Sequence, residues 1–439
     1  MQVQALPGFR DFYPDDFALR AHLFRAFRAV AARYGFEEWD GPPLEPLDLY
    51  TKKSGDEIVG QLYAFTDKGG REVALRPELT PTLARMVAAR ANGLKKPIRW
   101  FAIPQLFRYE RQQRGRLREH FQLNCDLIGE PGPLADAEVI ALAVDIMREL
   151  GLGPGDIRVR LSDRRLLNEA LDAAAVPEAA RPHAYQAIDK LGRAEFGGAQ
   201  AQFVAAGGDV AVLERLQAAG RVRTLPEVRA ALGLAPSTDV PLARVIGALE
   251  AMGLGAFVDV DVTIVRGLAY YTGTVFELFD AGRSLRAICG GGRYDGLVLA
   301  LGGVDLPCVG FGMGDVVLGE LLKERGLAPA GSRVVDVFVA AVTPEDEPHV
   351  LALARALRDH GCRTEYALGG QSLPKQLKLA DARGARLAVV IGPDDRAAGT
   401  VMLKDLAAKQ QRALPAATAA AEIAAALGGT TVAGRGPQA

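Results

Sequence analysis

The chain has 439 residues, of which 49% are hydrophobic, so it is long enough for about three domains with sizeable cores. Its 52 Lys and Arg residues nearly balance 53 Asp and Glu residues, and the formal net charge of −1 excludes a histone-like protein that binds polyanions through its overall charge, although not a local basic groove. The four cysteines are scattered and form no CxxC pair, so we expect neither a disulfide framework nor a metal site of Cys and His ligands.

The first residues, MQVQALPGFRDFYP, carry neither the basic flank nor the apolar core of a signal peptide. No stretch of about 18 apolar residues runs unbroken in the chain. We therefore expect a cytoplasmic protein without a membrane-spanning segment.

The N-terminal third predicts one helix followed by extended segments. Apolar residues recur at helical spacing from Leu23 to Tyr34, and Gly35 provides a stop, so a helix is expected over residues 15–34. Extended segments are expected at 72–76, 98–109 and 118–129, and a second helix at 136–151.

Residues 75–85, LRPELTPTLAR, form a transition from a strand to a helix. Thr80 followed by Pro81 is typical of an N-cap and the first helical turn. An N-cap explains Thr80 but not Glu78, whose carboxylate suits a substrate ammonium group.

Residues 108–118, RYERQQRGRLR, pack five arginines into eleven positions between two expected strands. Guanidinium groups bind phosphate oxygens in a bidentate manner and stay charged at physiological pH. A loop of this kind suits a nucleotide or the end of an RNA, and a solvent-exposed basic hairpin is the alternative that these residues leave open.

Polar and apolar residues alternate along the segment that follows this loop. Period two places His120, Gln122, Asn124 and Asp126 on one face, and Phe121, Leu123, Cys125 and Leu127 on the other. A polar face usually lies in solvent, but this strand leads into an apolar region, so a polar pocket lining is an equal alternative.

Residues 166–250 differ in character, because Leu, Ala and Arg recur there at helical spacing, interrupted by Gly and Pro, as in a helical insertion. Strands are expected again at 257–266, 271–279, 285–289 and 308–313, the last followed by a helix. A glycine-rich loop is expected at Gly290–Gly292, where successive glycines allow close approach of a ligand to the backbone, although many hairpins use such a triplet. Tyr270 and Tyr271 are adjacent in a strand, so only one of them can serve a pocket.

Pro329 and Gly331 mark a linker. Beyond it, the strand-like segments VVDVFVAAV, CRTEYAL and RLAVVIG are separated by helical patterns at 345–360 and 373–384. This order predicts a βαβαβ unit of an α/β domain.

Taken together and in this order, the segments resemble the histidyl-tRNA synthetase family of class II aminoacyl-tRNA synthetases. GFRDFYP and PPLE (42–45) are similar to its opening and motif 1 regions, LRPELT to its amino-acid-binding segment, and FRYERQQRGR with FQLNCD to its motif 2. VRGLAYYTGTVFE and GGGRYDGL are similar to its two histidine-specific signatures. The resemblance covers nearly the whole chain.

The resemblance implies an α+β catalytic core, with an antiparallel sheet flanked by helices. It divides the chain into a catalytic domain at 1–165 and 251–328, a helical insertion at 166–250 and an anticodon-binding domain at 333–428. The implied reaction activates L-histidine with ATP and Mg²⁺ to histidyl-adenylate and transfers it to the 3′ end of tRNA(His). It also implies a homodimer, without DNA or a membrane as partner.

The resemblance also implies roles for individual residues. Arg108 and Arg266 are the catalytic pair, in which Arg108 holds the α-phosphate of ATP and Arg266 bridges it to the histidine carboxylate. The residues implied for histidine are Glu78, Thr80, Gln122, Asp126, Arg266, Tyr270, Tyr271 and Tyr294. Those implied for ATP are Arg108, Glu110, Gly290, Gly291 and Gly292, and those for the acceptor end of the tRNA are Gln113, Arg116 and Arg118.

Two departures from the family pattern stand out. Ala269 occupies a position where the family usually has Asp. In the motif 3 region, Asp315 and Val316 stand where Glu and an ATP-binding Arg are expected. Either Arg286 or Arg293 is a candidate to replace the missing arginine.

The missing arginine keeps alternative functions open. One is a histidine-sensing regulatory subunit of ATP phosphoribosyltransferase, which shares the catalytic fold but lacks the C-terminal domain. Another is a tRNA-binding regulator without catalytic activity. The βαβαβ unit and the arginine-rich loop favour the synthetase over the regulatory subunit.

Overall fold

The computed structural model describes residues 4–51, 60–110, 115–191, 195–237, 240–265, 271–329 and 335–428. Contacts between residues divide the chain into two compact units, Met1–Pro329 and Ala330–Ala439.

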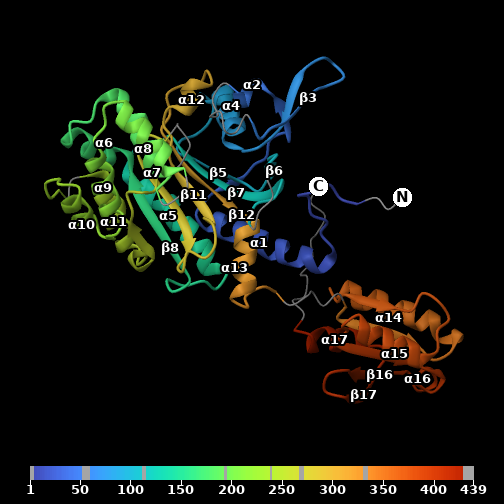
Figure 1. Ribbon diagram of the computed structural model, residues 1–439. Coiled ribbons are helices and arrows are strands. Elements are labelled where there is room, and N and C mark those ends of the chain that lie inside the picture. The colour runs from blue at the N-terminus through green and yellow to red at the C-terminus, as the bar shows by residue number, and fades with distance from the viewer. Residues whose placement is uncertain are drawn as a thin grey trace. The chain divides into compact units, whose positions relative to one another are not determined.

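Within the described part of unit 1, nine strands form a large sheet in the order β1-β5-β7-β12-β11-β10-β8-β9, with β6 paired to β7 (Figure 1). The pairs are antiparallel except for β1 with β5 and β8 with β9. The strands are β1 (Glu37–Glu38), β5 (Ile98–Ala102), β6 (Gln105–Phe107), β7 (Glu119–Ile128), β8 (Ile157–Asp163), β9 (Val258–Val260), β10 (Thr274–Asp280), β11 (Cys289–Arg293) and β12 (Cys308–Gly314). The predicted antiparallel sheet is thereby confirmed.

A second, three-stranded sheet in the order β2-β4-β3 carries the segment before α4. Its strands are β2 (Leu44–Pro46), β3 (Tyr63–Thr66) and β4 (Glu72–Leu75). The helices around the two sheets are α1 (Pro14–Arg33), α2 (Asp48–Thr51), α4 (Thr80–Arg90), α5 (Pro133–Glu149), α12 (Leu297–Ala300) and α13 (Asp315–Glu324). The first predicted helix therefore begins at Pro14, a residue suited to a first helical turn.

A group of helices separates β8 from β9 along the chain and gathers beside the large sheet (Figure 1). These helices are α6 (Arg164–Ala173), α7 (Arg181–Asp189), α8 (Phe196–Ala205), α9 (Val210–Ala219), α10 (Leu225–Ala231) and α11 (Pro241–Ala251), with short 3₁₀ turns at Glu178–Ala180 and Gly255–Phe257. The excursion returns the chain to β9 next to β8, so the sheet is continuous across it.

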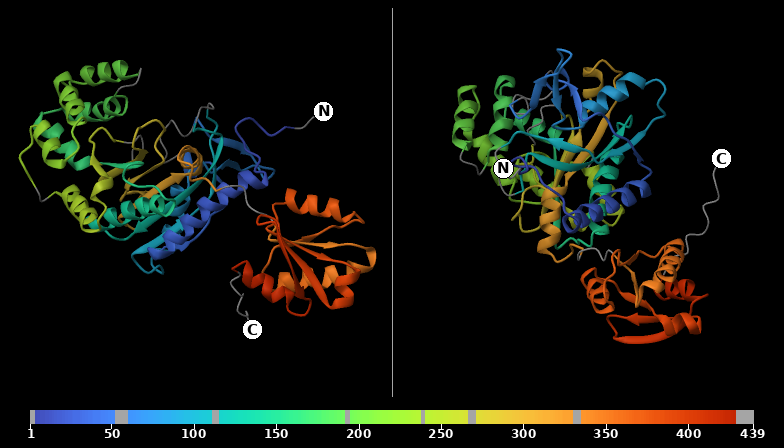
Figure 2. Two further views of the ribbon diagram at one scale, coloured as in Figure 1. Left: turned by 90° about the horizontal axis from the view of Figure 1, so that it is seen from below. Right: turned by 90° about the vertical axis from the view of Figure 1, so that its right-hand side faces the viewer.

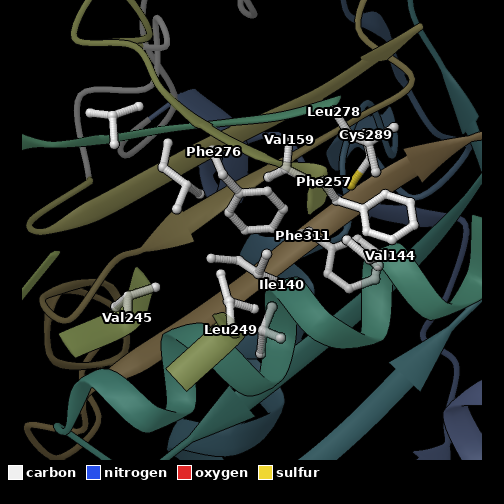
Figure 3. Packing of buried hydrophobic residues seen from close by; sticks show 14 of the residues in the cluster. Ile140, Val144, Val159, Val245, Leu249, Phe257, Phe276, Leu278, Cys289 and Phe311 are labelled. Atoms are coloured by element: carbon white, nitrogen blue, oxygen red, sulfur yellow. The ribbon is translucent and has the colours of Figure 1, made fainter. Parts of the chain in front are cut away.

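The core of unit 1 forms around α5, whose apolar residues are buried on nearly all sides. Figure 3 shows Ile140 and Val144 of α5 packed toward Phe276 and Phe311 of the sheet. Burying a large apolar side chain stabilises the fold by about 1.5–3 kcal/mol. Through this packing, α5 supports the part of the sheet that underlies the cavities described below.

Three expectations about local structure were wrong. Residues 290–292 lie in β11 rather than in a loop, and the strand expected at 285–289 is mostly the turn that precedes it. Of the strand expected at 257–266, the structure describes residues 257–265, and among these Val258–Val260 are extended and paired. The pattern also missed β8.

Unit 2 is a five-stranded sheet in the order β14-β13-β15-β16-β17, with helices on both faces (Figure 2). Its strands are β13 (Val337–Ala341), β14 (Thr364–Tyr366), β15 (Leu387–Ile391), β16 (Thr400–Asp405) and β17 (Gln410–Pro415). Its helices are α14 (Glu347–Asp359), α15 (Leu373–Ala382), α16 (Pro393–Ala398) and α17 (Ala419–Ala426), with a 3₁₀ turn at Pro344–Asp346. The parallel pairs β13–β14 and β13–β15 confirm the predicted βαβαβ unit, to which β16 and β17 add in antiparallel fashion.

Candidate active site

Two adjoining cavities lie over the large sheet of unit 1. The smaller has a volume of about 80 Å³, enough for several water molecules or a small polar ring, and the larger has about 870 Å³. Arg108, Gln122, Gly290 and Gly312 line both. A ligand that fills the small cavity therefore meets a ligand in the larger one at Arg108.

The polar face of β7 forms one wall of the small cavity. Gln122, Asn124 and Asp126 line it, as period-two alternation allowed, while Leu123 and Cys125 belong to the core. The Gln122 side-chain amide donates a hydrogen bond of 2.9 Å to Asn124 Oδ1, which orients Gln122. Asn124 was placed on this face by the alternation but was not among the expected ligands.

Asp126 is the acidic group at the base of the small cavity. The Tyr294 hydroxyl donates a hydrogen bond to Asp126 Oδ1, and both side chains are buried. Burial raises the pKa of Asp126 to about 7, and the hydrogen bond from Tyr294 opposes this shift. Tyr271 is also buried and lines the cavity, so one end of it consists of groups that can bond to a polar ring.

Two glycines of β12 make room for the side chains of β7. A Cβ atom at Gly310 would collide with the Asp126 carboxylate, and one at Gly312 would collide with the Gln122 amide. In the alternating sequence of β12, Phe311 packs in the core and also borders the small cavity, while Gly310 and Gly312 leave space there for the side chains of β7.

The segment 76–80 forms the opposite side of the small cavity, where Glu78 and Thr80 line it. Arg76 is buried and fixes this segment through bonds to Asp40 (2.8 Å) and to the carbonyl of Gly41 (2.6 Å). Thr80 is the first residue of α4, and Leu79 occupies the N-cap position without a capping side-chain bond, so the expected N-cap role of Thr80 was wrong.

Arg108 follows β6 and stands at the junction of the two cavities. Its Nε donates a hydrogen bond of 2.9 Å to the carbonyl of Pro77, directly beside Glu78. A carbonyl carries no net charge, so this bond fixes the guanidinium without neutralising it.

The larger cavity contains four described arginines, Arg108, Arg116, Arg283 and Arg286, together with the acids Glu110, Asp189 and Glu277. Glu110 is buried and forms an ion pair of 2.5 Å with Arg116. Burial, with the positive charges of Arg108 and Arg10, lowers the pKa of His120 to about 3, so this imidazole is neutral. Four arginines against three acids leave the described lining with a small excess of positive charge, which favours an anionic ligand.

The remaining expected ligands differ in position. Arg118 lines neither cavity and stacks on Tyr109, with its guanidinium carbon 4.2 Å from the ring centre. Among the three glycines, Gly290 lines both cavities, whereas Gly291 and Gly292 are packed against the backbone of β12 and β10. Arg266, Tyr270 and Gln113 lie outside the described residues, as does Ala269.

The structure separates the two arginines proposed as replacements for the motif 3 residue. Arg293 is buried and forms an ion pair of 2.6 Å with Asp136 of α5, and it lines neither cavity, so its proposed role was wrong. Arg286 lines the larger cavity, and so does Val316. Asp315 is buried in a bond of 2.9 Å from Arg10, which also pairs with Glu119 at 2.5 Å.

Over the described ranges, no group of three or more His, Cys, Asp or Glu side chains is arranged to hold a metal ion. No helix in the described part of the chain is long and apolar enough to cross a membrane.

Comparison with known proteins gives the same family for both units. The family model of histidyl-tRNA synthetases matches residues 8–314, and that of the anticodon binding domain matches residues 336–426. The chain is 47% identical over 422 residues to the histidine–tRNA ligase of Opitutus terrae, covering 94% of this chain and 96% of that one. It is 40% identical over 411 residues to the chloroplastic/mitochondrial histidine–tRNA ligase of Arabidopsis thaliana, covering 94% and 85%.

Among solved structures, the histidyl-tRNA synthetase from Nostoc superposes with a TM-score of 0.81 at 25% identity, covering 97% of this chain and 100% of that one. A family model that spans most of the chain, together with a relative at 47% identity, leaves one assignment. The chain belongs to the histidyl-tRNA synthetase family.

Proposed function

We propose that histidine binds in the small cavity and ATP in the larger one, and that Arg108 holds the α-phosphate where the two meet. The protein is a histidine–tRNA ligase, as its family and its 47% identity to a curated ligase show. The observation that carries the assignment of the cavities is that Arg108 lines both of them.

In the small cavity, Glu78, Thr80 and Gln122 receive the α-ammonium group of histidine, and Asp126, Tyr271 and Tyr294 bond to its imidazole ring. A site that pairs buried polar groups with a polar side chain rejects analogues that lack those groups by about 10⁴–10⁵-fold. Arg266 and Tyr270 are further proposed ligands of histidine, and Arg266 is proposed to bridge its carboxylate to the α-phosphate.

In the larger cavity, Glu110 lies near the adenine and Gly290 beside the ATP phosphates. Gly291 and Gly292, which follow Gly290 in β11, are also proposed for the nucleotide site. They would contribute only through the backbone of this strand, because both are packed against neighbouring strands. Carboxylates such as Glu277 in this cavity suit Mg²⁺, which typically binds through one or two carboxylates and the phosphates of its substrate. When bound with ATP, Mg²⁺ supplies positive charge to the leaving pyrophosphate.

The reaction needs positioning and charge rather than a nucleophilic side chain. A histidine carboxylate oxygen forms a bond to the α-phosphorus while the bond from that phosphorus to pyrophosphate breaks, which brings two anions together. Fixed guanidinium groups stabilise this arrangement. In the second step, a terminal ribose hydroxyl of the tRNA attacks the histidyl carbonyl and AMP leaves.

For the tRNA, we propose that Gln113, Arg116 and Arg118 meet the acceptor end. Arg116 lies in the larger cavity and Arg118 stacks on the exposed Tyr109. Residues 336–426 match the anticodon binding domain and so supply the second contact. This domain also counts against the regulatory-subunit alternative, which lacks it.

We further propose that the protein works in the cytoplasm as a homodimer. Four free, buried cysteines in the described residues suit a reducing compartment. The segments 15–34 and 42–45, which resemble motif 1, are the proposed subunit interface. Light scattering is expected to give twice the chain mass of 46.7 kDa, and a monomer at micromolar concentration would contradict the dimer.

ATP–pyrophosphate exchange, measured with each amino acid separately, tests the proposed reaction. We expect exchange with histidine alone. Exchange with another amino acid would contradict the assignment of the small cavity, and no exchange with any amino acid would favour a binding protein without catalytic activity.

A further inference from the structure

The turn between β10 and β11 forms one wall of the larger cavity. Asp280 at the end of β10 accepts hydrogen bonds of 2.9 Å from the backbone amides of Ser284 and Leu285 and from the Ser284 hydroxyl. The turn is therefore fixed from within, and it carries Arg283 and Arg286 to the cavity.

Arg286 lies beside the first turn of α13. A Cβ atom placed on Gly115 would be 3.8 Å from Arg286 Cδ and 3.3 Å from a methyl group of Val317, so these three residues meet at one point. Val316 and Val317 line the same cavity. The Arg286 side chain thus brings a positive charge to a place where the cavity-lining residues of α13 are the apolar Val316 and Val317, while Asp315 at the start of the helix pairs with Arg10.

The other three described arginines of this cavity differ from Arg286 in their surroundings. Arg108 is bonded to the carbonyl of Pro77 at the junction with the small cavity, and Arg116 is paired with Glu110. The Arg283 guanidinium lies over the Phe279 ring, 4.8 Å from its centre. When Arg108 holds the α-phosphate, the β- and γ-phosphates extend into the larger cavity and need a further cation.

We propose that Arg286 is an ATP-binding residue that contacts the β- and γ-phosphates and takes the place of a cation at position 316. This inference rests on the proposed binding of ATP in the larger cavity. The guanidinium fork suits phosphate oxygens. Arg286 is exposed, so its guanidinium is accessible to a phosphate that enters the cavity.

The test compares Arg286→Ala and Arg286→Lys with wild type in histidine-dependent ATP–pyrophosphate exchange. We expect Arg286→Ala to raise the KM for ATP by roughly 10- to 100-fold, the usual cost of losing a charged hydrogen-bond partner. The KM for histidine is expected to stay near its wild-type value, and Arg286→Lys to recover part of the loss. Because Arg286 is exposed, the melting temperature should not change.

AMP separates a contact to the outer phosphates from a general effect on the nucleotide. It keeps the α-phosphate at Arg108 but lacks the β- and γ-phosphates, so its inhibition constant should be the same in wild type and Arg286→Ala. Arg283→Ala, from the same turn, is the matched control and should raise the KM for ATP much less. Val316→Arg in the Arg286→Ala background should lower the KM for ATP again.

Three results would overturn the inference. They are an unchanged KM for ATP in Arg286→Ala, an equal rise in the KM values for ATP and histidine, and an equal loss of affinity for ATP and AMP. Failure of Val316→Arg to restore ATP binding would remove the link to position 316. Wild-type protein without histidine-dependent exchange would instead refute the proposed function, and this inference with it.

Discussion

The buried carboxyl group of Asp126 lies beside the Tyr294 hydroxyl, which can both donate and accept a hydrogen bond. Removing a carboxylate from water disfavours its charged form, and one hydroxyl bond from Tyr294 offsets only part of that cost. The empty site therefore holds a carboxyl group that titrates near neutral pH. Above that pH its charge is ready to accept a hydrogen bond from a ring N–H.

Asp126→Asn should change both binding and the pH dependence of stability. The pKa of Asp126 in the folded protein, about 7, lies above the value of 3.8 for an ordinary aspartate. Its contribution to stability is therefore fully present below about pH 4 and is lost as pH rises through 7. Over this interval, the free energy of unfolding of wild type should fall by about 4 kcal/mol relative to Asp126→Asn.

Denaturant titrations at pH 4.5 and pH 8 should capture about 3 kcal/mol of this difference, because a carboxyl group of pKa 3.8 in the unfolded chain is already mostly ionised at pH 4.5. Tyr294→Phe is the control, because loss of its hydroxyl bond should raise the pKa of Asp126 further and shift the fall to higher pH. In exchange assays, Asp126→Asn should raise the KM for histidine more than the KM for ATP. Equal losses for the two substrates would remove Asp126 from the imidazole site.

At the scale of elements, the pocket depends on which residues of neighbouring strands share a face. Period-two alternation in β7 predicted that Gln122 and Asp126 lie together, because strand geometry alone decides it. The glycines of β11 were misread as a loop because glycine is depleted in strands. Their close packing against β12 and β10 explains them, and a single sequence does not reveal which strands pair across a gap of many residues.

The position of Arg286 near the start of α13 is another feature that local patterns do not contain. Arg286 and Val316 are separated along the chain by β11, α12 and β12. Their meeting point depends on the antiparallel register of β11 and β12. The sequence supplied both candidate arginines, but only the fold distinguishes Arg286 from the buried Arg293.

Gly310→Ala tests the steric role of β12. The new methyl group would collide with the Asp126 carboxylate, so we expect a loss of about 1–3 kcal/mol in the free energy of unfolding, as for other overpacked sites. The KM for histidine should rise, since Asp126 must move. Thermal unfolding and exchange kinetics measure the two effects.

Gly314→Ala is the matched control, because a Cβ atom there has no neighbour within 4 Å. It should leave both stability and the KM for histidine close to wild type. Similar effects of the two substitutions would show that the strand, rather than the space next to Asp126, is sensitive to alanine.

Arg293→Ala tests the tie between β11 and α5. It would leave Asp136 buried without its ion-pair partner, and breaking such a pair costs about 3–5 kcal/mol. We expect a lower melting temperature but an unchanged KM for ATP in the protein that remains folded. A higher KM for ATP at full stability would return Arg293 to the nucleotide site.

At the scale of the whole molecule, each unit has its own apolar core. The cluster around α5 belongs to unit 1, while Val337 and Val339 pack with α14 and α17 on one face of the sheet of unit 2. Phe338 and Ala340 pack with α15 on the other face. Units with separate cores generally fold independently.

A fragment of residues 1–329 should therefore fold and retain histidine-dependent ATP–pyrophosphate exchange, while a fragment of residues 335–428 should unfold cooperatively by itself. Charging of tRNA by the first fragment should be much weaker than by the full chain, because the matched anticodon binding domain is missing. Circular dichroism and aminoacylation assays measure these outcomes. Loss of exchange in a folded 1–329 fragment would show that activation also needs unit 2.

The wall of the small cavity formed by Gly310 and Gly312 has a consequence for engineering this enzyme. Since glycine is already the smallest residue, no substitution at these two positions can enlarge the chamber, and every change there narrows it. Variants selected to accept a bulkier amino acid should therefore carry their mutations on the neighbouring strand β7 or at Tyr271 and Tyr294, never at these two glycines.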